Sequence, residues 1–246
     1  MIEIETDIPT ADGAMNTFVA RPESGGPYPA ILMLMDAPGV REALRDIARR
    51  IATSGYVVAL PNLYYRKARE VVVGPTRNHP DAEKNIAHMT GFRTSIGHPE
   101  VIRDTGALLA WLAADSGVKP GKVGTTGYCM SGAYVVATAA AYPDRIACGA
   151  SFYGTRLMED GPHAPYKQLG KIKAELHFAF AEHDSYVPLD QVEAFKAELG
   201  RAPFRSSVEV LTGTEHGYAF TDRGVHHRVA AERHYEVMLD LYRRHL

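Results

Sequence analysis

Three residue types that together support nucleophilic catalysis follow one another along the chain: Cys129, Asp184 and His216. A cysteine thiolate can attack a carbonyl carbon, a histidine can transfer the protons, and an acid can hold the histidine in the required tautomer. The order nucleophile, acid, histidine allows each group to follow a different strand of one parallel sheet. We therefore predict that these three residues form a catalytic triad.

The residues around Cys129 have the pattern of a sharp strand-to-helix turn that displays a nucleophile. The stretch Gly127-Tyr-Cys-Met-Ser131 matches the motif G-x-[S/C]-x-G with serine in place of the last glycine. Small residues are needed at both flanks because a larger side chain would collide with the strained backbone. Ser131 is a weaker candidate nucleophile, since Cys129 and Ala133 would then be the flanks. By itself, the motif leaves open that Cys129 is an ordinary buried cysteine.

The elements that must position these groups alternate between strands and helices. An apolar run over 176–182 leads to Asp184, and an alternating run over 207–211 leads to His216. Further strands are expected at 28–35, 56–60 and 146–152, with helices at 40–54 and 225–244. A hairpin around Asp12-Gly13 opens the chain. This pattern predicts an α/β fold with a mostly parallel central sheet and helices on both faces, a three-layer sandwich.

The length of 246 residues and the 46% hydrophobic content predict one domain over 1–246. The stretch 61–97 has no sustained periodicity, and we expect an excursion with short helices that forms a lid or a pocket wall. Tyr64 and Tyr153 follow strand ends, where open parallel sheets bind ligands, so both are candidate pocket walls. Ordinary core packing explains these two tyrosines equally well.

The charge and the cysteine content exclude several classes of partner. The 27 basic and 29 acidic residues give a formal net charge of -2, which does not favour a nucleic-acid surface.

Two cysteines are too few for a disulfide framework, and the first residues lack the pattern of a signal peptide, so a cytoplasmic protein is expected. No apolar run approaches the roughly 20 residues that span a bilayer. None of the 11 histidines has metal-ligand spacing, so no metal is expected.

Three segments together resemble the dienelactone hydrolase family of α/β-hydrolases: the residues 127–132, 181–188 and 216–220. The resemblance covers the chain from about Met15 to the last helix. It implies a Cys129, Asp184 and His216 triad that cleaves a lactone or a related ester without a cofactor. It also implies an oxyanion hole made by the backbone N–H groups of Ala37 and Met130.

The resemblance implies two further roles near the nucleophile. Asp36 is similar to the family's acid that contacts the thiol, which is usually a glutamate. Phe220 stands where the better-known members have an arginine that holds a substrate carboxylate, so it is a candidate pocket residue. An aromatic ring cannot make that charge-assisted contact. We therefore expect neutral or more apolar esters and lactones to be preferred, unless Arg223 or Arg93 replaces the missing arginine.

A second class of function remains open from the sequence. The same scaffold could serve as a non-enzymatic ligand-binding protein or as a thiol-redox sensor, because a fold does not determine an activity. The intact order of nucleophile, acid and histidine favours the enzyme. We expect a small-molecule ester or lactone as its partner, no nucleic acid and no membrane, and either a monomer or a small homo-oligomer.

Overall fold

Eight strands form one sheet in the computed structural model, which describes residues 1–246, and their spatial order is β1-β2-β4-β3-β5-β6-β7-β8. The strands are β1 (Ile2–Thr10), β2 (Gly13–Arg21), β3 (Ala30–Leu34), β4 (Val57–Pro61), β5 (Val123–Tyr128), β6 (Ile146–Phe152), β7 (Glu175–His183) and β8 (Ser206–Glu215). The strands from β3 to β8 pair in parallel, whereas β1 and β2 are antiparallel neighbours at one edge. The predicted opening hairpin is confirmed, because β1 pairs with β2 in an unbroken register around Asp12-Gly13.

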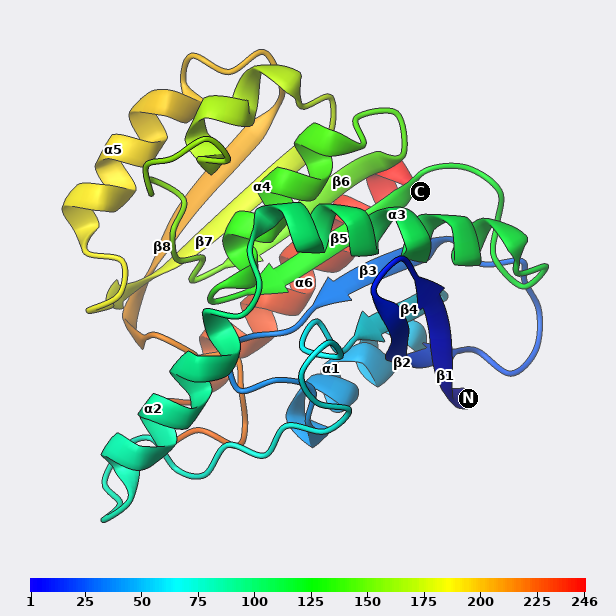
Figure 1. The fold of residues 1–246 in the computed structure, drawn as a ribbon. Coiled ribbons are helices and arrows are strands. Elements are labelled where there is room, and N and C mark those ends of the chain that lie inside the picture. The colour runs from blue at the N-terminus through cyan, green and yellow to red at the C-terminus, as the bar shows by residue number, and fades with distance from the viewer.

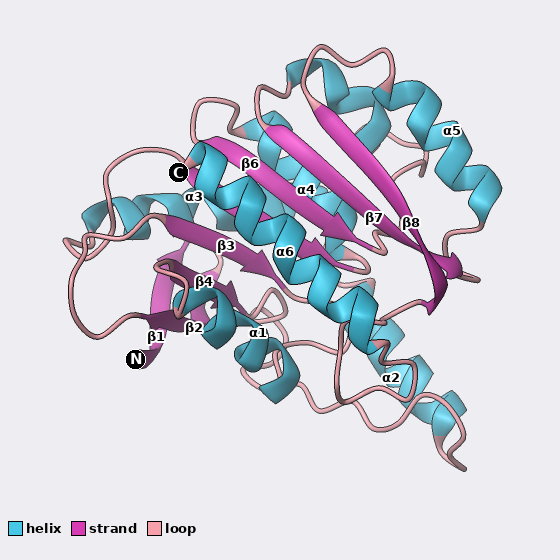
Figure 2. Cartoon of the chain, turned by 180° about the vertical axis from the view of Figure 1, so that it is seen from behind, coloured by secondary structure: helices cyan, strands magenta, loops and turns pink.

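The helices cover both faces of this sheet. They are α1 (Glu42–Ala52), α2 (Ala82–Arg93), α3 (His98–Ala114), α4 (Ser131–Ala141), α5 (Leu189–Leu199) and α6 (Arg228–His245), with a 3-10 helix at Pro165–Lys171. In Figure 1, α3, α4 and α5 lie in front of the sheet. Figure 2 shows α1 and α6 on the opposite face. The predicted three-layer α/β-hydrolase arrangement is confirmed.

Burial on both faces explains why the central strands are so apolar. Every residue of β3 and of β4 is buried, as expected for parallel strands covered by helices on both sides. Two apolar clusters result, one with the inward faces of α1 and α6 and the other with those of α3 and α5. In α1, for example, Leu44, Ile47 and Ile51 are buried at helical spacing.

The stretch 61–97 differs in detail from its prediction. It contains a single twelve-residue helix, α2, rather than several short ones, and no side chain of α2 is buried. Figure 1 shows this helix projecting beyond the end of the sheet. The sequence of α2 has no continuous apolar face, which is consistent with a helix that does not pack into the core.

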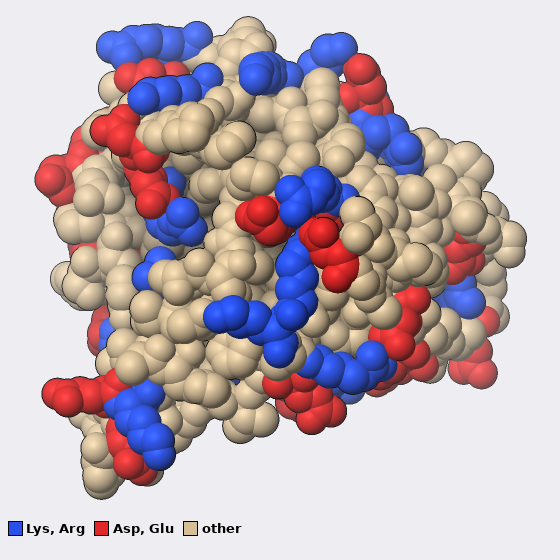
Figure 3. Space-filling model, in the orientation of Figure 1, with Lys and Arg blue, Asp and Glu red and all other residues tan.

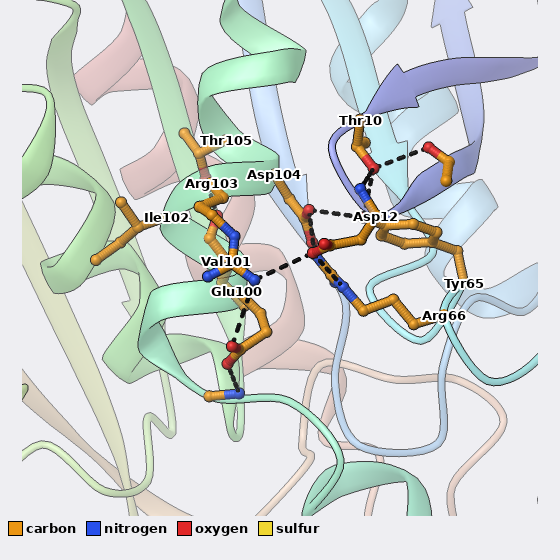
Figure 4. Close-up of polar contacts among 12 residues, drawn as sticks. Thr10, Asp12, Tyr65, Arg66, Glu100, Val101, Ile102, Arg103, Asp104 and Thr105 are labelled. Carbon is orange, nitrogen blue, oxygen red and sulfur yellow. Dashed lines mark hydrogen bonds and ion pairs between the residues drawn. The ribbon is translucent and has the colours of Figure 1, made fainter.

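The beginning of the same stretch is firmly attached to the body of the protein. The Arg66 guanidinium donates two hydrogen bonds to the buried carboxylate of Asp104 on α3, at 2.7 and 2.8 Å, and the Tyr65 hydroxyl donates a third at 2.9 Å (Figure 4). Arg66 also pairs with Asp12 in the β1–β2 turn at 2.7 Å. Buried, hydrogen-bonded ion pairs of this kind fix geometry more reliably than they add stability. The residues just after β4 are thus held against both α3 and the hairpin.

The surface carries charges of both signs. In Figure 3 the acidic and basic side chains of the visible face are interspersed, and they do not gather into a patch of one sign. No helix combines the length and the apolar character that crossing a bilayer requires.

Candidate active site

Cys129 lies at the sharp turn between β5 and α4. Its φ of 55° is in the left-handed region, which is unusual for a residue other than glycine. The turn requires a glycine at Gly127, because a Cβ there would lie 2.4 Å from the carbonyl oxygen of Ser131. The predicted strand–turn–helix context of the motif is therefore present, and the strained backbone displays the half-buried Cys129 side chain beyond the end of the sheet.

Ser131 is poorly placed to act as a nucleophile. It is fully buried in the first turn of α4, and its hydroxyl donates a hydrogen bond to the carbonyl oxygen of Met35 at the end of β3. The hydroxyl proton is thus engaged away from any substrate. This geometry favours Cys129 over the alternative that the sequence left open.

Asp184 and His216 meet at the carboxyl ends of β7 and β8. The His216 Nδ1 atom lies 2.7 Å from the Asp184 Oδ2 atom, and both side chains are buried. The other carboxylate oxygen accepts the backbone N–H groups of Tyr186 at 2.8 Å and Val187 at 3.3 Å. Two backbone donors and one imidazole therefore fix the orientation of this carboxylate. The other ring nitrogen of His216, Nε2, has no hydrogen-bond partner within the protein.

The environment of His216 favours its protonated form. Burial by itself would lower the pKa of this imidazole, but the negative charge of the nearby Cys129 thiolate and the hydrogen bond to Asp184 outweigh burial and raise the pKa to about 9. A protonated imidazole beside a cysteine can donate a proton to the leaving group of a reaction at that sulfur. The arrangement can thus supply both a nucleophile and a proton.

Two tyrosines enclose the imidazole of His216. The Tyr153 ring packs edge-on against it with ring centroids 5.1 Å apart, and the Tyr186 ring lies at 4.8 Å. Tyr153 directly follows β6 and has a positive φ of 40°. Tyr186 is 59% exposed, so it covers the histidine from the solvent side.

Two backbone amides near Cys129 are free to donate hydrogen bonds. The N–H groups of Ala37, which follows β3, and of Met130, which follows Cys129, form no hydrogen bond with another group of the protein. Buried backbone donors are nearly always paired, so two unpaired donors beside a nucleophile are informative. They are the two residues whose N–H groups the family resemblance assigns to an oxyanion hole.

Asp36 lies in the same region but is paired with arginines. One oxygen of its buried carboxylate accepts from Arg41 at 2.5 Å, and the other accepts from Arg223 at 3.0 Å. No hydrogen bond joins Asp36 to the thiol of Cys129, so the thiol contact expected from the sequence is absent from this arrangement. The physical reason is that two guanidinium groups occupy both oxygens of the carboxylate.

A cavity of about 610 Å³ opens beside Cys129 and His216. Its walls include Cys129, His216 and Tyr153, whereas Tyr64 and Phe220 do not line it. These two predicted pocket residues are corrected: both are buried in the apolar core. The Arg41 guanidinium lies over the Phe220 ring, 4.6 Å from the ring centroid, and the Tyr64 hydroxyl contacts Ala37 and Met130.

Four arginines contribute to the walls of this cavity, and three of them have acidic partners. Arg223 pairs with Asp36, Arg77 pairs with Glu215 at 2.9 Å, and Arg156 pairs with Glu159 at 2.5 Å. The remaining one, Arg93 at the end of α2, forms neither an ion pair nor a hydrogen bond. The structure therefore brings both Arg93 and Arg223 to the cavity, which the sequence could not establish.

One face of α2 forms a wall of the cavity, in the stretch 61–97 for which a lid or a pocket wall is expected, although Ile86, Met89 and Thr90 were not predicted individually. Ile86, Met89, Thr90 and Arg93 recur at helical spacing and all line the cavity. Tyr186 and Arg156 were likewise missed. For Tyr186 a signal was available, because it lies two residues after Asp184; α2 has no continuous apolar face that would mark the side that borders the cavity.

The chain matches the model of the dienelactone hydrolase family over residues 15–246. This chain belongs to the dienelactone hydrolase family. It is therefore a hydrolase, and the resemblance found in the sequence is confirmed. No group of three or more histidine, cysteine or acidic side chains has the arrangement of a metal site.

Named relatives support this membership over nearly the whole chain. A Synechocystis protein named "Putative carboxymethylenebutenolidase" is 26% identical over 97% of this chain and 95% of its own length. An Escherichia coli protein of the same name is 25% identical over 98% of this chain and 86% of its own length.

Solved structures share the fold. The structure named "Putative Dienelactone Hydrolase" from Klebsiella pneumoniae has a TM-score of 0.85 and 24% identity, covering 99% of both chains. A dienelactone hydrolase from Anabaena variabilis has a TM-score of 0.71 and 12% identity, covering 100% of this chain and 98% of the other.

Proposed function

We propose that this hydrolase cleaves a lactone or a carboxylic ester through a thioester formed on Cys129. One observation carries the proposal: Cys129, at its strained turn, and the Asp184–His216 pair lie at the same end of the sheet. Cys129 and His216 border one cavity, and Asp184 holds His216 by a hydrogen bond. A thiolate, a protonated imidazole and two free amides are the groups that acyl transfer requires.

In the proposed acylation step, the Cys129 thiolate attacks the carbonyl carbon and the carbonyl oxygen becomes an oxyanion. The N–H groups of Ala37 and Met130 donate hydrogen bonds to this oxyanion. The imidazolium of His216 then gives its proton to the departing alkoxide or enolate, which leaves as an alcohol or enol. Asp184 holds the imidazole in place throughout.

Hydrolysis of the thioester needs His216 in its neutral form. Formation of the thioester removes the negative charge of Cys129, which is the strongest of the influences that raise the pKa of His216. The pKa of the imidazole should therefore fall in the acyl-enzyme. The neutral Nε2 atom can then accept a proton from water as the water attacks the thioester. The C–S bond breaks, the acid product leaves, and the Cys129 thiolate and the His216 imidazolium are regenerated.

A thiol-alkylating reagent tests this function directly. Iodoacetamide should label the half-buried Cys129 and abolish hydrolysis of a chromogenic ester, while Cys148 stays unlabelled because it is fully buried and burial raises the pKa of its thiol to about 12. Peptide mass analysis identifies the labelled cysteine. Activity that persists after complete labelling of Cys129 would favour another nucleophile, and a protein with no turnover of any ester would favour the binding or sensor alternative.

The placement of Arg93 supports a different proposal for the charge of the substrate. The preference for neutral substrates rested on Phe220 at the position of the family's arginine, but Arg93 reaches the cavity from α2 and has no acidic partner. An unpaired guanidinium beside apolar side chains such as Ile86 and Met89 suits an anion that carries an apolar body. We infer that a carboxylate-bearing ester or lactone is the better substrate.

Arg93→Ala should therefore reduce kcat/KM for a carboxylated lactone on the order of ten- to a hundredfold, the usual range for a hydrogen bond to a charged group. The neutral methyl ester of the same compound should be affected little. Arg77→Ala is the matched comparison, because Arg77 lines the same cavity but is paired with Glu215, and its effect should be smaller. Equal losses for the acid and its neutral ester would contradict a charge interaction at Arg93.

A further inference from the structure

The peptide unit between Asp36 and Ala37 carries one of the two free amides, and its orientation decides where that N–H points. Its own carbonyl oxygen, on Asp36, accepts a hydrogen bond from the Gly39 N–H at 3.0 Å. The carbonyl of the next peptide unit, on Ala37, accepts a hydrogen bond from the Tyr64 hydroxyl at 2.9 Å. The unit is therefore fixed at its own carbonyl and on its C-terminal side.

The preceding peptide unit is held in the same way. The Met35 carbonyl accepts the hydroxyl proton of Ser131, which is buried in the first turn of α4. Three consecutive carbonyls, those of Met35, Asp36 and Ala37, are thus bound by three donors from separate places. Two of these donors are side chains that the triad does not use, Ser131 and Tyr64.

Tyr64 also contacts the residue that carries the second free amide. Its hydroxyl oxygen lies 3.3 Å from the Met130 sulfur, so one buried hydroxyl touches both residues of the predicted oxyanion hole. Burial raises the pKa of Tyr64 well above its usual range, so the hydroxyl keeps the proton that it donates.

The backbone around Tyr64 is itself rigidly held. The Tyr64 N–H donates to the side-chain oxygen of Asn62 at 3.0 Å. The two following residues, Tyr65 and Arg66, bind the buried carboxylate of Asp104, as Figure 4 shows. A hydroxyl mounted on such a support can define the position of a neighbouring peptide to within the fraction of an ångström that catalysis requires.

We propose that Tyr64 and Ser131 are positioning residues that hold the Ala37 N–H in line with the Met130 N–H. Neither side chain borders the cavity, and both act through the backbone between them. This inference rests on the proposed function, because the two amides matter only if an oxyanion forms. It assigns a role to Tyr64 in place of the pocket-wall role that the sequence suggested.

The test compares acyl transfer with a reaction of the same thiol that forms no oxyanion. Tyr64→Phe should lower kcat for a neutral chromogenic ester on the order of tenfold, since misplacing one oxyanion donor costs less than deleting it. KM should change little. The rate at which methyl methanethiosulfonate modifies Cys129, and the pH profile of that rate, should stay at the wild-type value, because that disulfide exchange involves no carbonyl group.

Tyr242→Phe is the matched control. Tyr242 is also fully buried, its hydroxyl has no hydrogen-bond partner, and it lies on α6 away from the cavity. This variant should keep the wild-type kcat. Ser131→Ala removes the hydrogen bond to the preceding peptide unit. It should likewise lower kcat while the rate of thiol modification stays at the wild-type value. This variant replaces Tyr64→Phe in the test if Tyr64→Phe does not fold.

Two results would overturn the inference: a wild-type kcat in Tyr64→Phe, or a loss of kcat with an equal loss of thiol reactivity. The second would mean that Tyr64 supports Cys129 itself and has no specific effect on the amide. Failure of the proposed function has a different signature, since the wild-type protein would then either hydrolyse esters after Cys129 is blocked or hydrolyse no ester at all.

Discussion

Cys129→Ala is expected to reduce kcat for ester or lactone hydrolysis roughly 10⁴-fold or more, the scale on which removal of a catalytic nucleophile acts. The loss follows because no other nucleophile lies at the turn: the Ser131 hydroxyl is buried and donates to the Met35 carbonyl. Steady-state kinetics with a chromogenic ester measure the effect. Rapid-quench mass spectrometry of the wild-type protein should also detect a covalent acyl group on the peptide that contains Cys129, and this adduct should be absent from the variant.

The second cysteine provides the control for this prediction. Cys148 lies in the middle of β6, is fully buried and does not line the cavity. Cys148→Ala should therefore leave kcat close to that of the wild type, although its stability falls modestly because a buried side chain is shortened. An active Cys129→Ala protein would refute the thioester mechanism, whatever the behaviour of the control.

Asp184→Asn is expected to lower kcat roughly 10³- to 10⁴-fold, as when a triad acid is neutralised without a change of shape. Asparagine can still accept the Tyr186 N–H, but it no longer stabilises the imidazolium and can present its amide to the His216 Nδ1 atom, which favours the wrong tautomer. Its side chain is nearly the same size, so thermal unfolding should show that the fold is kept.

The pH dependence provides a second measurement of the same pair. In the wild type, the acylation rate should fall as the pH rises through about 9, because His216 then loses the proton that the leaving group needs. The hydrogen bond to Asp184 and its charge both raise this pKa, so Asp184→Asn should move the alkaline limb to lower pH. Single-turnover rates across the range measure this shift. A limb that stays in place would mean that another group controls it.

Local patterns in the sequence were enough to predict much of the fold. Alternation of apolar strands with amphipathic helices indicated the layered sheet, since an all-buried strand such as β3 must be covered on both faces. Gly127 and Ser131 likewise indicated the turn at Cys129, because the requirement for small side chains there is a local steric effect. Asp184 and His216 were predictable from their place after strand patterns, although the pattern over 207–211 ends before β8 does, at Glu215.

Only the tertiary structure decided which side chains border the cavity and which support it from below. Tyr64 and Phe220 both follow structural elements at the correct end of the sheet, yet long-range packing places them in the core. Asp36 is bound by Arg223, which is 187 residues away in sequence, and no local pattern reports such a partner. Arg93 becomes a wall residue because one face of α2 borders the same cavity as Cys129 and His216. These contacts join segments that are distant along the chain, so they depend on how the layers assemble and not on the periodicity of any one segment.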